Sequence, residues 1–168
     1  MSKLPEFVLD RVFDAPPELV WRAWTDPTLL AQWDGPNVET VIHRFDLEPG
    51  GVWLNEMKMS QGSSYQKVVF KEIVEPEKLV WHHFSSVDAD WNPVANPMMP
   101  DWPALLLTTV TFAAVADGGG TSVRLSQIPL DASDAEIACF AEMKDNMGGG
   151  WGAGYALIDQ LLAGMAGS

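Results

Sequence analysis

The feature that most constrains this fold is one long helical segment that ends a chain otherwise made of short strands. In residues 132–163, apolar side chains such as Ile137, Phe140 and Met143 recur at the spacing of one helix face. Three consecutive glycines at 148–150 interrupt this stripe, which predicts either a kink or a close approach to another element. A single long amphipathic helix has one obvious partner, the concave face of a curved antiparallel sheet.

The remainder of the chain supplies the strands for such a sheet. We expect a strand at 6–13, short helices at 18–25 and 28–33, and strands at 39–47, 52–60, 65–74, 78–84, 105–114 and 121–128. Short turns separate most of these strands, and Asp117-Gly118-Gly119-Gly120 is a strong hairpin signal. This pattern is typical of a meandering antiparallel sheet. The sequence therefore predicts a single α+β domain over residues 1–168, in which the curved sheet and the C-terminal helix enclose an internal cavity.

Residues 85–103 are a long stretch without clear periodicity. Prolines break the segment up, yet it also holds Trp91, Met98, Met99 and Trp102. Long loops with their own apolar residues are usually lids or binding loops, and two tryptophans argue against plain disorder. We therefore expect an inserted, lid-like loop, with these four apolar residues as its lid residues.

The charge balance excludes several classes of partner. The chain carries 10 lysines and arginines against 23 aspartates and glutamates, a formal net charge of −13 at pH 7. Such a chain repels a phosphate backbone and an anionic membrane surface, so we expect no nucleic-acid partner. No apolar run approaches the roughly 20 residues that span a bilayer, and the N-terminal residues lack the apolar core of a signal peptide. We therefore expect no membrane insertion and a cytoplasmic protein.

Metal and nucleotide sites are not predicted either. Cys139 is the one cysteine, so neither an internal disulfide nor a cysteine-based metal site can form. His82 and His83 are adjacent on a strand and point to opposite faces, so they cannot chelate one ion. The glycine triplets at 118–120 and 148–150 lack the strand-to-helix context of a phosphate-binding loop. We expect no metal and no cofactor.

Four stretches in order carry a resemblance to a known family. They are Phe13-Asp14-Ala15-Pro16-Pro17-Glu18-Leu19-Val20-Trp21, then Thr25-Asp26-Pro27 with Gln32-Trp33 and Gly35-Pro36, then Asp46-Leu47-Glu48-Pro49-Gly50-Gly51-Val52-Trp53, and finally Gly150-Trp151-Gly152. Together they resemble the START-like, or helix-grip, superfamily (SRPBCC), and within it the activator of heat-shock protein 90 ATPase homologue-like family. The resemblance spans almost the whole chain and implies the helix-grip fold. The chain departs from the family pattern in the insertion at 91–102 and at Trp33-Asp34, where the family usually has Trp-Trp.

The inward face of the predicted sheet supplies the candidate ligand contacts. Leu79, Trp81 and His83 share one face of their strand, and the resemblance places that face toward the pocket. The expected ligand-binding residues are Trp53, Asn55, Met57, Glu72, Trp81, His83, Thr108, Val110, Phe112, Met143, Met147, Trp151 and Tyr155. An apolar stripe of this kind also suits a plain hydrophobic core, so both interpretations stay open.

The polar members of that set have more than one interpretation. His83 could act as a general acid or base, as a hydrogen-bonding specificity group, or as a satisfied core histidine. Glu72 has inward parity on its strand, and functional and structural roles are equally compatible with a buried carboxylate there. Asn55 and Thr108 could orient a ligand or satisfy each other. His83 and Glu72 are the catalytic candidates.

We therefore predict a protein that binds a small hydrophobic ligand, such as a lipid, in an internal cavity. The superfamily resemblance implies an alternative, an enzyme of the polyketide cyclase/dehydrase type, whose acid/base pair must lie within about 3 Å of the substrate. The family name suggests a third, a co-chaperone or protein-interaction module, but that name comes from relatives with additional domains, and we do not expect a chaperone partner. Homodimerisation is compatible with the sequence, although nothing locates an interface.

Overall fold

The computed structural model describes residues 5–33, 39–60, 62–94, 101–115 and 120–166, without side chains at 59, 85–86, 145–154 and 165–166. The elements are β1 (Phe7–Phe13), α1 (Pro17–Thr25), α2 (Pro27–Trp33), β2 (Glu39–Phe45), β3 (Val52–Met59), β4 (Gly62–Val74), β5 (Lys78–Val87), β6 (Leu105–Ala114), β7 (Thr121–Pro129) and α3 (Asp134–Ala166). Their order confirms the predicted series of a strand, two short helices, six strands and one long helix.

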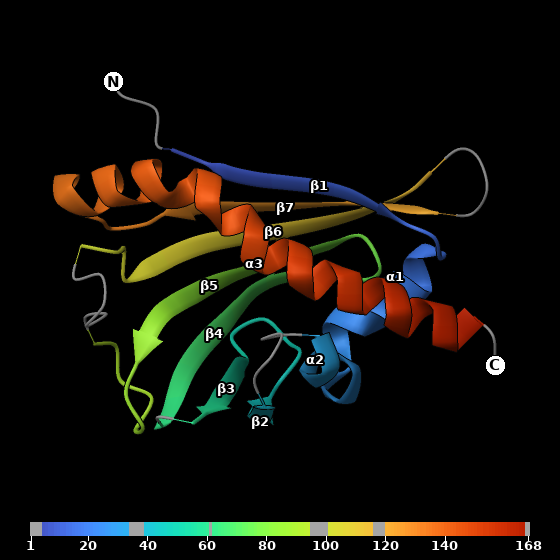
Figure 1. Ribbon diagram of the computed structural model, residues 1–168, viewed down its shortest axis with the longest axis horizontal. Coiled ribbons are helices and arrows are strands. Elements are labelled where there is room, and N and C mark those ends of the chain that lie inside the picture. The colour runs from blue at the N-terminus through green and yellow to red at the C-terminus, as the bar shows by residue number, and fades with distance from the viewer. Residues whose placement is uncertain (1–4, 34–38, 61, 95–100, 116–119, 167–168) are drawn as a thin grey trace.

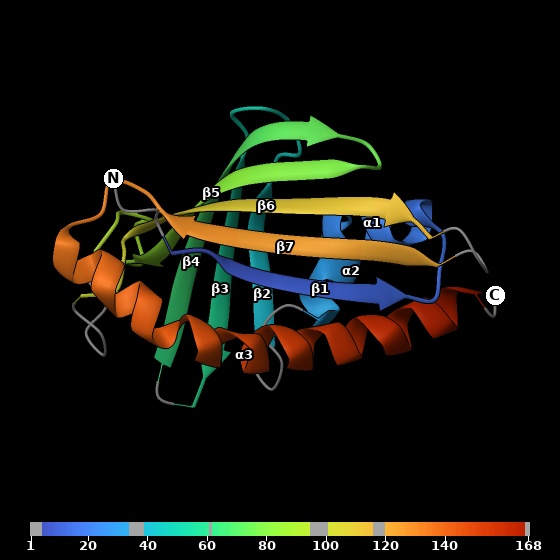
Figure 2. The same ribbon diagram turned by 90° about the horizontal axis from the view of Figure 1, so that it is seen from above.

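The seven strands form one antiparallel sheet in the order β1-β7-β6-β5-β4-β3-β2. Each strand from β2 to β7 pairs with its neighbour in the chain, which is the predicted meander, and β1 closes the far edge by pairing with β7. Figure 1 shows α3 running across the curved sheet. In Figure 2, none of the described helices lies over the viewed face of β1, β7 and β6. This is the predicted α+β helix-grip architecture.

Alternation along the strands separates two faces of the sheet. On β6, every second residue from Leu106 to Phe112 is buried, as the period of a strand requires. Phe112 packs edge-to-face on Trp21 of α1 at 5.4 Å, and Phe13 of β1 packs on Tyr155 of α3 at 5.2 Å. We call the face that contacts these helices the inner face, and the opposite one the outer face.

The two short helices begin where the sequence signals predict. Pro17 opens α1, where its missing N–H costs nothing. Asp26 separates the helices, and its carboxylate Oδ1 accepts a hydrogen bond from Thr28 N at 3.0 Å in the first turn of α2. Trp33 then ties the helices together, because its Nε1 donates to Ala23 O at 2.7 Å.

The long helix α3 is anchored at both of its ends. At its start, Ser133 N donates to Glu136 Oε1 at 2.8 Å and Glu136 N donates to Ser133 Oγ at 3.1 Å, which is a capping box. Phe140 is fully buried near this end, while Ile158 and Leu162 are buried toward the other. The helix backbone continues through the glycine triplet. The expected interruption at 148–150 therefore does not divide α3 into two helices.

The segment that we expected to be one long loop is partly ordered as secondary structure. Strand β5 continues to Val87, three residues beyond the predicted end at 84. A tight turn follows, in which Asp88 Oδ1 accepts hydrogen bonds from Asp90 N at 2.9 Å and Asn92 N at 3.0 Å. Trp91 occupies this turn with a φ of 67°. An aspartate side chain that accepts hydrogen bonds from the backbone two and four residues later is a local turn signal, which hydrophobic periodicity does not contain.

Candidate functional site

Trp81 lies in the middle of the inner face, on β5, which is the central strand of the sheet. Its ring centroid is 6.4 Å from that of Trp24, 6.1 Å from Trp53 and 6.2 Å from Phe70. These neighbours come from α1, β3 and β4, so helix and sheet both contribute to the enclosure. Trp81 is only 3% exposed. Trp53 and Trp81, two of the expected contacts, therefore lie in one aromatic cluster that also contains Trp24 and Phe70, which the sequence analysis did not include.

The indole N–H of Trp81 is buried without a hydrogen-bond acceptor among the described residues. Two other tryptophans show what a satisfied indole looks like in this chain. Trp53 Nε1 donates to Asn55 Oδ1 at 2.5 Å, and Trp33 Nε1 donates to a backbone carbonyl. Leaving a buried donor unpaired costs roughly 1–3 kcal/mol, so the bare Trp81 N–H requires an explanation.

His83 is the next inner-face residue along β5. Its register partners, Val68 on β4 and Leu106 on β6, are buried, whereas His83 itself is only partly covered. Its imidazole has no hydrogen-bond partner among the described residues. Desolvation lowers its pKa from 6.5 to about 4. The ring is therefore neutral at neutral pH and offers one donor and one acceptor.

Two buried polar side chains lie beside Trp81 on the next strands. Thr108 is the register partner of Trp81 on β6, and Gln127 is the partner of Thr108 on β7. Gln127 Nε2 donates to Thr108 Oγ1 at 3.1 Å. The sequence reasoning included Thr108 but missed Gln127. Gln127 lies two residues after Leu125 on β7, so both side chains face inward, and this alternation was the signal that could have identified it.

The inner face becomes more accessible toward one end of β3 and β4. Asn55 is buried, while its partner Gln66 and the next inner residue, Met57, are partly accessible. His83 is also partly accessible, one register row away from this pair. A buried aromatic floor thus continues into an accessible strip that carries amide, imidazole and thioether groups.

The described inner-face strand residues include one charged side chain, Arg11 of β1. Its guanidinium Nη2 pairs with the Asp159 carboxylate of α3 and lies over the Phe13 and Tyr155 rings, at 5.4 Å and 6.0 Å from their centroids. This ion pair joins an edge strand to α3. Trp81 belongs to the central strand β5, so no described strand residue supplies a counter-charge beside it.

The expectation that Glu72 faces the interior is wrong. A register shift lies between Phe70 and Glu72, and a shift of one residue moves every later side chain to the opposite face. Glu72 consequently pairs with Val80 on the outer face, and half of its side chain is exposed. Its carboxylate forms a surface ion pair with Lys78 Nζ at 3.3 Å.

Trp91 does not lie over the inner face as a lid would. It packs edge-to-face on Tyr65 at 5.3 Å and on His43 at 5.6 Å, and both rings belong to the outer side of β4 and β2. Trp102 packs on Phe140 of α3 at 5.5 Å. The other expected lid residues, Met98 and Met99, lie outside the described residues.

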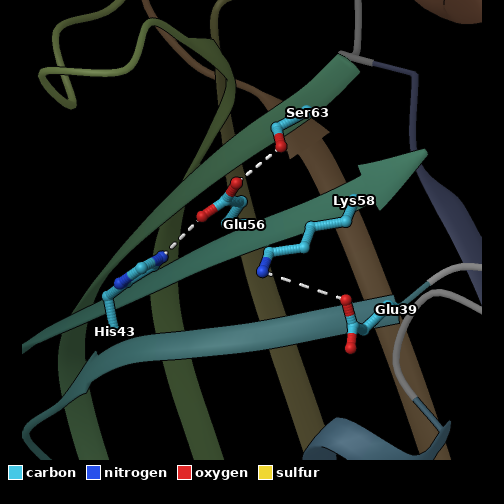
Figure 3. Close-up of polar contacts among 5 residues, drawn as sticks. All are labelled: Glu39, His43, Glu56, Lys58 and Ser63. Carbon is cyan, nitrogen blue, oxygen red and sulfur yellow. Dashed lines mark hydrogen bonds and ion pairs between the residues drawn. The ribbon is translucent and has the colours of Figure 1, made fainter. Parts of the chain in front are cut away.

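A polar cluster lies beside Trp91 on the outer face (Figure 3). Glu56 Oε2 accepts a hydrogen bond from Ser63 Oγ at 2.5 Å, and Glu56 Oε1 lies 2.8 Å from His43 Nε2. The hydrogen bond from Ser63, followed by that from His43, holds the pKa of Glu56 below its ordinary value. Lys58 and Glu39 form a separate contact at 3.9 Å. Because the serine binds the carboxylate and not the imidazole, the cluster lacks the geometry of an activated nucleophile.

The remaining expected contacts divide between core and helix. Val110 and Phe112 are buried against the short helices, and Met143 of α3 is partly accessible. Tyr155 is fully buried, and desolvation raises the pKa of its hydroxyl. Met147 and Trp151 belong to α3, but their side chains lie outside the described residues.

Two classes of site can be assessed over the described part of the chain. It contains no group of three or more His, Cys, Asp or Glu residues that could hold a metal ion. No helix in the described ranges is long and apolar enough to cross a membrane.

The comparison with protein families matches most of the chain. The model described as "Activator of Hsp90 ATPase homolog 1-like protein" matches residues 14–163. None of the curated proteins matches the chain.

Solved bacterial structures share the fold. A crystal structure of a Mycobacterium smegmatis protein is 24% identical, with a TM-score of 0.75 over 94% of this chain and 90% of that one. A solution structure from Arthrobacter aurescens is 22% identical, with a TM-score of 0.76 over 94% of this chain and 86% of that one. A Staphylococcus aureus protein of unknown function is 16% identical, with a TM-score of 0.68 over 99% and 98%. At these identities the likeness establishes the fold alone.

Proposed function

The chain belongs to the Activator of Hsp90 ATPase homolog 1-like family, and from that premise we propose that it binds a small, largely apolar molecule on the inner face of its sheet, below α3. The bound molecule covers the aromatic floor around Trp81 and extends toward His83. Sites of this kind are mostly apolar and hold a few convergent polar groups that fix the ligand's orientation.

The observation that carries this proposal is the bare N–H of Trp81. The group is buried, and no described residue accepts its hydrogen bond. A ligand acceptor would satisfy it and recover much of the free energy lost on burial. His83 supports the same location, since its neutral imidazole is also without a partner and remains partly accessible.

Binding fits these residues better than acid/base catalysis does. A cyclase or dehydrase needs two positioned titratable groups. Glu72, the other catalytic candidate, lies on the outer face in an ion pair with Lys78. Among the described strand residues, His83 is then the remaining candidate on the inner face, and a single neutral imidazole suits orientation of a ligand.

Native mass spectrometry of the freshly purified protein tests this proposal. We expect an excess mass on the order of a few hundred daltons that disappears on denaturation, as for a drug-sized ligand in an internal site. His83→Gln should alter the retained fraction, because it changes a polar contact without adding charge. Trp33→Phe is the matched control, since Trp33 donates its N–H to Ala23 O within the helices and borders the Trp81 cluster through Trp24, on which it packs at 4.6 Å.

Two results together would contradict the proposal. One is the absence of any excess mass, and the other is the failure of a fluorescent apolar probe to bind saturably to the folded protein. An apolar probe that binds equally well to the unfolded chain would count as the second result.

A further inference from the structure

The chemistry of the inner face also restricts what the polar end of the ligand can be. Trp81 Nε1 is a donor only, because an indole nitrogen has no free lone pair. The group that pairs with it must therefore be an acceptor. A bound ammonium group, whose polar end consists of donors only, leaves this N–H unpaired.

The acceptor is also uncharged, for a separate reason. Arg11 is the only charged side chain on the inner face of the described strands, and Asp159 already neutralises it. Arg11 belongs to the edge strand β1, whereas Trp81 belongs to β5, with β7 and β6 between them. A carboxylate or phosphate beside Trp81 would lose its hydration without gaining a counter-ion from the described strand residues, which is strongly unfavourable.

The rings that surround the Trp81 side chain are aromatic. The rings of Trp24, Trp53 and Phe70 lie 6.1–6.4 Å from that of Trp81. Two polar side chains on the neighbouring strands are engaged with each other, since Gln127 donates to Thr108. The part of a ligand that touches this cluster must be apolar apart from one acceptor atom.

We propose that the inner face selects an uncharged apolar molecule bearing a carbonyl-type acceptor, such as a ketone or ester, and that the Trp81 N–H is the specificity-determining donor. This inference rests on the proposed binding function. It assigns three charged classes to the poorly bound ligands: fatty acid carboxylates, phospholipids and protonated amines.

Three probes of matched chain length test the proposal: methyl undecyl ketone, dodecanoate and dodecane. Their affinities are measured by competition with a fluorescent apolar probe near neutral pH. We expect the ketone to bind roughly tenfold more tightly than dodecane, because one additional buried hydrogen bond changes an affinity by about this factor. Dodecanoate should bind at least about tenfold more weakly than the ketone, because of its desolvated charge.

Trp81→Phe supplies the decisive variant. It removes the donor and keeps an aromatic ring, so the ketone should fall to the affinity of dodecane while dodecane changes little by comparison. Trp33→Phe should preserve the ratio between ketone and dodecane, because that indole is satisfied by Ala23 O. The Trp33 variant controls for the general effect of replacing a buried tryptophan by the smaller phenylalanine.

A spectroscopic measurement on the unaltered protein covers the case in which Trp81→Phe fails to fold. The indole N–H proton of Trp81 should move downfield in the proton–nitrogen correlation spectrum when the ketone is added, and should not do so with dodecane. The Trp33 indole signal should stay in place with both probes.

The outcomes separate this inference from the function on which it rests. Equal binding of all three probes, or tightest binding of dodecanoate, would overturn the uncharged-acceptor inference and leave ligand binding intact. A ketone preference that survives Trp81→Phe would overturn the role of Trp81. Failure of every probe to bind, together with no co-purified molecule, would overturn the proposed function itself.

Discussion

At the scale of single residues, burial determines what a side chain can do chemically. Trp53 and Trp81 belong to the same aromatic cluster, yet Trp53 donates to Asn55 and Trp81 has no acceptor among the described residues. His83 is the second example, because desolvation keeps its imidazole neutral at pH values well below its ordinary pKa of 6.5. Neither difference is visible in the residue type.

The desolvated imidazole of His83 predicts a specific pH dependence of stability. The folded state holds the pKa of His83 at about 4, below its ordinary value of 6.5. Between these pH values the unfolded chain binds a proton that the folded chain does not, so the free energy of unfolding falls as the pH is lowered. His82 contributes in the same direction, because desolvation lowers its pKa too.

Urea denaturation at two pH values measures this contribution. From about pH 6.5 to about pH 5, His83 should account for a loss of roughly 1.5 kcal/mol in the unfolding free energy. Over the same pH interval, the unfolding free energy of the His83→Gln variant should fall by less than that of the unaltered protein, and the difference should be about the contribution of His83. Equal losses in the two proteins would mean that the imidazole is hydrated in the folded state.

At the scale of elements, irregularities in the strands decide which side chains meet. The register shift after Phe70 turns Glu72 outward, and a second one between Ile42 and Arg44 accompanies the outward position of His43. Simple parity fails at both places, since it assumes an uninterrupted period of two. Strands without such shifts, β6 among them, follow parity closely.

The turn between β2 and β3 gives a prediction at this scale. A Cβ on Gly51 would lie 2.1 Å from Asp46 O and 2.9 Å from Glu48 O, both backbone atoms. Gly51→Ala should therefore lower the free energy of unfolding by roughly 3 kcal/mol, the cost of a severe overpacking. Urea denaturation gives the value directly.

Gly50→Ala is the matched control for this turn. A Cβ there meets nothing within 4 Å, but the φ of +84° is unfavourable for alanine. Its expected cost is about 1–2 kcal/mol, from the left-handed backbone alone. A Gly51 variant no less stable than the Gly50 variant would show that the turn relaxes around the added carbon.

At the scale of the whole molecule, we expect repulsion between like charges to outweigh the attraction within the surface ion pairs. The net charge is −13, whereas exposed pairs such as Arg124–Asp10 and Lys78–Glu72 contribute little to stability, because water screens them. Salt at about 0.15 M screens both kinds of interaction. The melting temperature should therefore rise by a few degrees on addition of sodium chloride, by about the shift that roughly 1 kcal/mol produces.

Differential scanning calorimetry measures that shift, and choline chloride at equal ionic strength is the control for specific ion binding. Both salts should act alike if screening is the cause. A lower melting temperature in both would mean that the ion pairs, including Arg11–Asp159, outweigh the repulsion.

The sequence by itself determined the order of the elements, the antiparallel meander, the long C-terminal helix and the family. These follow from local signals, since periodicity, proline and glycine turns and capping residues act over a few neighbouring positions. It also predicted that Trp81, Asn55 and Thr108 are buried on one face, because uninterrupted strands keep their parity.

Only the tertiary structure decided which of those residues have a hydrogen-bond partner and which do not. Register shifts turned Glu72 away, an aspartate-capped turn directed Trp91 to the outer face, and packing left the Trp81 N–H without an acceptor among the described residues. Such outcomes depend on contacts between segments far apart in the chain, for example α1, β3 and β4 around Trp81. A pattern along the sequence describes the face of a strand, but it does not describe what the opposite element brings to that face.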